Sequence, residues 1–267
     1  MYLYPRPLLL LGLLLILNGI INAQVKNNFV WETSVQAGNI VKNAGDVPDN
    51  RSSFFFVLNP SVQTTGGEEW HHIYRFPRAG CKITLGDCGN RNELGYLAGL
   101  TPNITLRTYS GRRINTSVNL GLGIAYFNKP YDEITNPHNF YIGSHLTALA
   151  EASVQCEYGV GKNLSLISGL RVVHCSNSHY QVPNLGLNIL TLYMGVLINK
   201  RQAQALPERV PVEVPRPKVR FNIRSGIGVH ELARTLGPAG SPKYAIYVND
   251  FYVSRLFGRV SNVHAGL

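Results

Sequence analysis

Long stretches of this chain alternate between apolar residues and small or polar residues with a period of two. Through residues 115–127 and 146–158, even-numbered positions are mostly apolar and odd-numbered positions are largely small or polar. The same alternation returns in 163–176 and 188–199. Successive side chains of a β-strand point to opposite faces, so the pattern predicts strands with one apolar and one polar face.

The length of these segments favours a membrane barrel over a soluble domain. Each has 12 or more residues, whereas strands in soluble proteins usually have about 5–6. A transmembrane β-barrel turns its apolar face to lipid and its polar face to the lumen. A soluble β-sandwich, whose strands also alternate, is the alternative. The polar face carries Glu151, Glu157 and Arg171 beside small residues, which favours a narrow barrel interior.

The expected fold is therefore all-β, with an eight-stranded antiparallel outer-membrane β-barrel over residues 24–200. Eight is the smallest even strand number common in such barrels. The short connection 159–162 is typical of a periplasmic turn, whereas 128–142 and 177–185 are long enough for extracellular loops. The eight strands are predicted near 29–38, 53–63, 69–77, 94–107, 115–127, 145–159, 163–176 and 186–199.

The first 23 residues have the layout of a secretory signal peptide. Arg6 is their only charged residue, and an apolar run from residue 8 to 17 is interrupted only by a glycine. That run is short for a membrane span, which needs about 20 residues. Small residues follow up to Ala23, where cleavage is expected. The mature protein is therefore expected to be exported.

The chain after the barrel divides into a linker and a further β segment. Prolines and charges mark residues 201–218 as an extended linker. Alternation resumes in 219–267, for example at Phe221, Ile223 and Ile227. Two or three strands cannot close into a barrel. We expect an incomplete second barrel-like β repeat here, with an accessory hairpin domain as the alternative.

The net charge and the cysteine content limit which ligands and which disulfides we expect. The net charge of +10 favours either nucleic acid or anionic lipid head groups, and no nucleic-acid-binding motif is present. The four cysteines have no CxxC spacing, so no zinc site is expected. No other metal and no cofactor are expected either. Cys81 and Cys88 flank a polar segment that suits a loop disulfide. Cys156 and Cys175 have opposite parity, which predicts that they do not pair.

One polar cluster lies on the face that should be apolar. His174 and Ser176 share the even face of their strand, because residues i and i+2 point the same way. A hairpin loop centred near Gln181 places Asn188 opposite His174, and Asn188 also belongs to an apolar face. An unpaired polar group facing hydrocarbon costs several kcal/mol. The cluster is therefore either a lipid-facing serine hydrolase site or a polar strand end without catalysis.

The segment "HCSNSHYQVPNLGLN" (174–188) resembles the H-x-S-N signature and N-x-G segment of the outer-membrane lipid A 3-O-deacylases, the PagL-type or acyloxyacyl hydrolase-like proteins. The stretch "GLGIAYFNKPYDEITNPHNFYIGSHL" (121–146) is similar to versions found in Bacteroidetes-type members. The similarity covers about residues 115–200 well and 29–110 loosely. It implies an eight-stranded barrel that removes a 3-hydroxyacyl chain from lipid A.

The resemblance also implies roles for single residues. His174 would be the general base, Ser176 the nucleophile, and Asn177 a contributor to the oxyanion hole. The third position is Glu in well-known members and falls on Asn188 here. Asparagine can hold the imidazole tautomer but cannot stabilise the imidazolium by charge. Glu151 is the nearest acid by strand pairing, but its parity points it into the lumen.

The sequence therefore predicts an outer-membrane serine esterase that hydrolyses an ester-linked (3-hydroxy)acyl chain of lipid A or lipopolysaccharide, with the bacterial outer membrane as its location. The alternative is a non-enzymatic outer-membrane β-barrel with a structural or small-pore role. A third and weaker hypothesis is a soluble periplasmic β-domain that binds a ligand. No nucleic-acid partner is expected.

Overall fold

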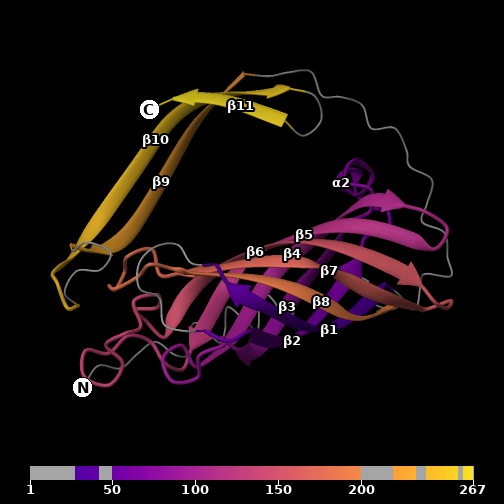
Figure 1. Ribbon diagram of the computed structural model, residues 1–267. Helices are drawn as coiled ribbons and strands as arrows, with labels where there is room; N and C mark the ends of the chain where they lie inside the picture. Colours follow the sequence, from indigo (N-terminus) through magenta and orange to yellow (C-terminus); the bar gives the residue numbers. More distant parts are fainter. Residues whose placement is uncertain (1–27, 42–49, 200–218, 233–238, 258–260, 267) are drawn as a thin grey trace.

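A computed structural model describes residues 28–41, 50–199, 219–232, 239–257 and 261–266. Its strands β1 to β8 form one closed antiparallel barrel, in which β1 pairs with β8 to complete the ring (Figure 1). The barrel strands are β1 (Phe29–Ile40), β2 (Ser53–Gln63), β3 (Arg78–Asp87), β4 (Tyr96–Ser110), β5 (Ile114–Phe127), β6 (Leu146–Gly159), β7 (Leu164–Ser176) and β8 (Leu187–Asn199). The predicted eight-stranded barrel is confirmed.

The two faces of the wall are those of a membrane barrel. Leu122 and Met194 point outward and are 68% and 63% exposed, whereas Arg171 and Glu151 point inward and are 1% and 5% exposed. An apolar outside and a polar inside invert the pattern of a soluble protein and match a barrel in lipid. The alternation seen in the sequence is thus the alternation between lipid-facing and lumen-facing positions.

Ion pairs fill the lumen. Arg171 on β7 contacts Glu151 on β6 and donates to Gln36 on β1 and Thr84 on β3, both at 3.1 Å. Lys82 Nζ lies 2.5 Å from the other oxygen of Glu151. One arginine therefore bridges strands from different sides of the barrel, and these three buried charges are paired, as burial requires.

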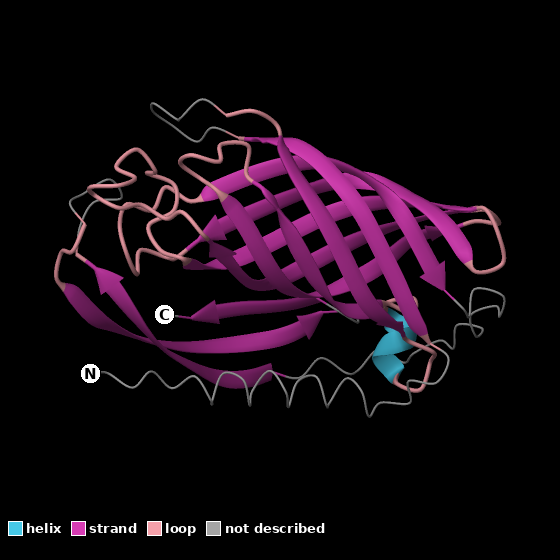
Figure 2. Cartoon of the chain, turned by 90° about the horizontal axis from the view of Figure 1, so that it is seen from below, coloured by secondary structure: helices cyan, strands magenta, loops and turns pink. Residues whose placement is uncertain are grey.

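The two ends of the barrel differ. The long loops gather at one end, and the short helix α2 (Glu69–Ile73) lies at the other, between β2 and β3 (Figure 2). At the loop end the interior is apolar, and the packed residues include Leu149, Cys175 and Leu187. The β7–β8 connection therefore starts and finishes on a rigid wall.

The strand predicted at 69–77 is wrong. Residues 69–73 form helix α2, which Glu68 caps at its N-terminus, and the third strand is β3 at Arg78–Asp87. The aromatic residues of this stretch favour a strand locally. The barrel instead uses the following segment, whose alternation places Lys82 inside and Leu85 outside.

The predicted disulfide between Cys81 and Cys88 is also wrong, since all four cysteines are free. Cys81 lies within β3 and Cys88 directly follows it. Seven residues of extended chain span about 23 Å, whereas a disulfide needs Cα atoms within about 7 Å. Cys156 is exposed and Cys175 buried, and they are unpaired, as their parity predicts.

The C-terminal segment forms an open sheet rather than a barrel among the described residues. Its strands are β9 (Val219–Glu231), β10 (Lys243–Phe257) and β11 (Ser261–Gly266), in the order β11-β10-β9. The sheet lies beside the barrel in both views. The predicted signal peptide, 1–23, and linker, 201–218, lie outside the described residues.

No helix in the part of the chain that the structure describes is both long and apolar enough to cross a membrane.

Candidate active site

His174 and Asn188 face each other across β7 and β8, in the register that the sequence predicts. His174 Nδ1 lies 2.7 Å from Asn188 Oδ1. The amide oxygen only accepts hydrogen bonds, so Nδ1 carries the proton and Nε2 is left as a base. Both side chains are on the outward face of the wall, and the short side chain of Ala150 is opposite His174 on the other neighbouring strand. The imidazole is therefore oriented and accessible from the membrane.

Ser176 is the last residue of β7 and lies on the same face as His174. Its Oγ accepts hydrogen bonds from Asn184 Nδ2 at 2.9 Å and from the Ser178 N–H at 3.2 Å. Its own proton meets no acceptor among the described residues. Residues i and i+2 of a strand are about 7 Å apart, a gap that an imidazole leaning along the strand can close. Such contacts often tighten only when substrate binds.

Gly186 makes room for this pair. Its φ is +73°, and a Cβ there would lie 3.0 Å from His174 Cε1 and 3.6 Å from Ser176 Cβ. Its N–H donates to Tyr141 O at 3.1 Å, which ties it to the β5–β6 loop. Any larger residue would be strained and would press on the imidazole.

Asn177 organises the loop. Its side-chain amide donates to Gln181 O at 2.7 Å and to Ser144 Oγ at 3.0 Å. Its backbone N–H donates to Asn184 Oδ1 at 3.3 Å. The side-chain donors are thus engaged within the protein, and the predicted oxyanion role of Asn177 stays a prediction.

Two residues of the site have no assigned role in the sequence-based prediction. Asn184 is 3% exposed and links Ser176 Oγ to the Asn177 backbone through the two ends of its amide. Gly186 has the positive φ described above. Both belong to the N-x-G segment of the motif, and this segment was the sequence feature that could have pointed to them. Their contacts depend on the path of the loop, which the alternation of apolar and polar residues does not predict.

Glu151 does not join the site. It lies inside the lumen, where its carboxylate is engaged by Lys82 and Arg171. Its partner across the β6–β7 ladder is Val173, which is buried on the inner face, whereas His174 is on the outer face. The wall separates this acid from the imidazole, as the sequence parity predicts.

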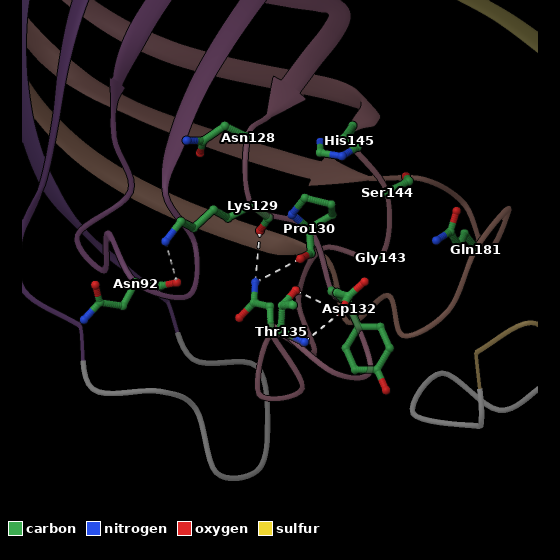
Figure 3. Close-up of a pocket in the computed structure, with 12 residues that line it drawn as sticks. Asn92, Asn128, Lys129, Pro130, Asp132, Thr135, Gly143, Ser144, His145 and Gln181 are labelled. Carbon is green, nitrogen blue, oxygen red and sulfur yellow. Dashed lines mark hydrogen bonds between the residues drawn. The ribbon is translucent and has the colours of Figure 1, made fainter.

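A polar hollow of about 460 Å³ opens beside the site (Figure 3). The residues around it include Asn128, Lys129, Asp132, Ser144, His145 and Gln181. Ser144 and Gln181 are also the partners of Asn177, so the hollow and the site share a border. The backbone N–H and hydroxyl of Thr135 donate to Asp132 and lower the pKa of its carboxyl. The hollow thus presents an ionised carboxylate, a lysine and several amides.

Among the described residues, no group of three or more His, Cys, Asp or Glu side chains is arranged to hold a metal ion. The chemistry available at the site is that of a hydroxyl, an imidazole and amides.

Solved structures that are similar to this chain include the following two. The crystal structure of Neisserial surface protein A (NspA) is 12% identical, with 64% of this chain and 96% of that chain covered and a TM-score of 0.45. The crystal structure of the outer membrane enzyme PagL is 16% identical, with 63% of this chain and 99% of that chain covered and a TM-score of 0.42. No curated protein matches the chain significantly.

A family model matches the sequence itself. It is described as Lipid A 3-O-deacylase (PagL) and matches residues 56–196 of the 267. The match includes seven of the eight barrel strands in whole or large part, together with His174, Ser176 and Asn188. More than half of the chain is matched, and the chain belongs to the lipid A 3-O-deacylase (PagL) family.

Proposed function

We propose that this protein is a serine esterase of the bacterial outer membrane, which hydrolyses an ester-linked (3-hydroxy)acyl chain of lipid A. The observation that carries the proposal is the hydrogen bond between His174 Nδ1 and Asn188 Oδ1 on the lipid-facing wall, with Ser176 two residues further along the strand. The family match supports lipid A deacylation as the reaction.

The proposed reaction has two halves. Ser176 Oγ attacks the ester carbonyl carbon while His174 Nε2 takes the hydroxyl proton, and Asn188 holds the ring. The tetrahedral intermediate expels the sugar oxygen, which receives that proton and leaves as an alcohol. Water then attacks the acyl-serine with His174 as the base. The fatty acid leaves, and the proton on the imidazole returns to Ser176.

Developing charge on the carbonyl oxygen needs hydrogen-bond donors. Asn177 is the proposed donor. The bond from its backbone N–H to Asn184 is its longest, at 3.3 Å, and is therefore the weakest of its ties. A small shift of the loop on substrate binding frees that N–H for the oxyanion.

The position of the site suits a lipid substrate. His174 and Ser176 open onto the outer face of the barrel near the loops, so an acyl chain can approach from the bilayer while its polar head stays at the surface. The adjoining hollow, with Lys129, several amides and the ionised Asp132, is a suitable place for the hydroxyl groups of a sugar.

The alternative, a non-enzymatic barrel, divides into a structural role and a small pore. The lumen argues against the pore, because Arg171 bridges residues of β1, β3 and β6 across it. A passage would require these buried pairs to separate, which is costly. A structural barrel remains the alternative that activity measurements decide.

The test is to incubate the refolded protein in detergent with lipid A and to analyse both products by mass spectrometry. We expect lipid A lighter by one hydroxyacyl group and an equal amount of free hydroxy fatty acid, with no reaction for His174→Ala. If wild-type protein of native gel mobility releases no fatty acid, the esterase proposal fails and the structural barrel takes its place.

A further inference from the structure

The C-terminal sheet contacts the barrel at the loop that carries the candidate site. Most of β9 is exposed, but its last residue, Glu231, is fully buried. In Figure 1 the end of β9 and the start of β10 lie at the loop end of the barrel. A buried carboxylate on an otherwise exposed strand indicates a specific contact, because burial of a charge is costly without partners.

Glu231 makes three hydrogen bonds, two of which join the hairpin to the loop. Its Oε2 accepts from the Val182 N–H at 2.9 Å, and its Oε1 accepts from the Ser241 N–H at 2.7 Å. Its own N–H donates to His179 O at 2.9 Å. Glu231 therefore contacts the loop at two points, three residues apart, and also binds Ser241, which lies just before β10.

Two contacts with aromatic rings add to these hydrogen bonds between the hairpin and the loop. Lys243 Nζ lies 4.1 Å from the centroid of the Tyr180 ring, within cation–π range. The rings of His179 and His230 are 5.5 Å apart. Residues at the start of β10 and the end of β9 thus contact the same short stretch, 179–182, that Glu231 binds.

The stretch 179–182 is connected to the site by hydrogen bonds. Gln181, next to Val182, accepts from the Asn177 side chain at 2.7 Å. Asn184 on the other side binds both the Asn177 backbone and Ser176 Oγ. A displacement of Val182 would therefore reach the nucleophile through its sequence neighbours.

The backbone of the loop also needs support. Ser178 and His179 have φ values of +54° and +62°, a region that non-glycine residues adopt at an energetic cost. Such conformations persist where surrounding structure holds them. Glu231 binds the carbonyl of His179 directly, so the hairpin supplies part of that support.

We propose that the end of β9 and the residues leading into β10 form a positioning element for the esterase site, with Glu231 as its central residue. The proposal rests on the proposed function. Glu231 touches no reacting atom and acts by keeping loop 177–186 in the arrangement that orients Asn177, Asn184 and Ser176. Without it, a smaller fraction of molecules has a competent site, so turnover falls while binding of the acyl chain at the wall changes little.

The test substitutes Glu231 in the full chain, once by an amide and once by alanine, and compares both variants with an amide substitution elsewhere in the same sheet. Glu231→Gln leaves one side-chain acceptor, and Glu231→Ala leaves none. Asp250→Asn is the control, because Asp250 lies in the middle of the same sheet and pairs with Arg224 away from the loop. For lipid A hydrolysis we expect kcat to fall about tenfold or more in Glu231→Ala, with KM within about twofold. Glu231→Gln should be intermediate and Asp250→Asn unchanged.

Hydrogen exchange separates this inference from the proposed function. The amide of Val182 donates to Glu231, so the peptide covering 177–186 should exchange faster in Glu231→Ala than in wild type or Asp250→Asn. Faster exchange together with lower kcat supports the inference. Unchanged exchange, or unchanged kcat in Glu231→Ala, overturns it. A wild-type protein that does not hydrolyse lipid A overturns the proposed function, and unchanged exchange would still overturn the contact independently.

Discussion

His174 and Asn188 are polar side chains on a wall that otherwise faces hydrocarbon. Alone, each would cost several kcal/mol in lipid, and their mutual hydrogen bond at 2.7 Å reduces that cost. The bond also selects the imidazole tautomer that a general base needs. In the proposed mechanism, asparagine supplies no negative charge beside the imidazolium, so we expect Asn188 to limit the rate through charge rather than through geometry.

Substitutions of Asn188 separate these two contributions. Asn188→Leu removes the acceptor and should lower kcat on lipid A by about a hundredfold or more. Asn188→Glu keeps the acceptor and adds a charge, and it should raise kcat by about tenfold. Steady-state hydrolysis of lipid A in detergent measures both. A leucine variant with the wild-type rate would show that Asn188 has no part in catalysis.

Gly186 is the second residue whose replacement is informative. Gly186→Ala should lower kcat by about tenfold or more, because a Cβ there would lie 3.0 Å from the imidazole and the φ of +73° disfavours alanine. Gly161→Ala is the control, since a Cβ at that turn meets nothing within 4 Å. Heat-modifiable gel mobility should show both variants folded. Equal activity in the two variants would contradict the crowding argument.

Among the elements, the β7–β8 hairpin could be predicted best. Alternation gave the face of His174, and a loop centred near Gln181 gave its pairing with Asn188, which the structure confirms. The loop itself could not be predicted, because Asn184 and Gly186 act through contacts with residues that only the folded chain brings near. The helix at 69–73 was not predicted either, because the aromatic residues of this stretch locally favour a strand. The folded barrel takes its third strand from the following segment instead.

The lumen-facing charges belong to the barrel strands rather than to the site. Glu151→Leu would leave Lys82 and Arg171 unpaired in the interior, and loss of one partner of a buried pair costs about 3–5 kcal/mol. Urea unfolding in lipid vesicles should show that loss, with a smaller one for Glu151→Gln. The kcat of the folded fraction should stay within about threefold of wild type. A loss of kcat as large as that of His174→Ala would instead make Glu151 part of the catalytic group.

In the whole molecule, the residues that stabilise the barrel and the residues of the candidate site lie in different places. Paired charges and an apolar layer fill the barrel, and the candidate site lies on the outside near the long loops. The C-terminal sheet, which the sequence predicts as an incomplete repeat, is an open sheet among the described residues, and it contacts the site loop through Glu231 at the end of β9. Under the proposed function, we expect a substrate to reach the site from the membrane rather than through the lumen.

The most direct test of the esterase proposal compares two serines on the same strand and face. Ser176 is at the loop end of β7, and Ser168 is exposed on the outer wall eight residues earlier. Release of hydroxy fatty acid from lipid A, followed by mass spectrometry, should be unchanged in Ser168→Ala and reduced by about 10³-fold or more in Ser176→Ala. Release at the wild-type rate by folded Ser176→Ala would contradict the proposal that Ser176 is the nucleophile.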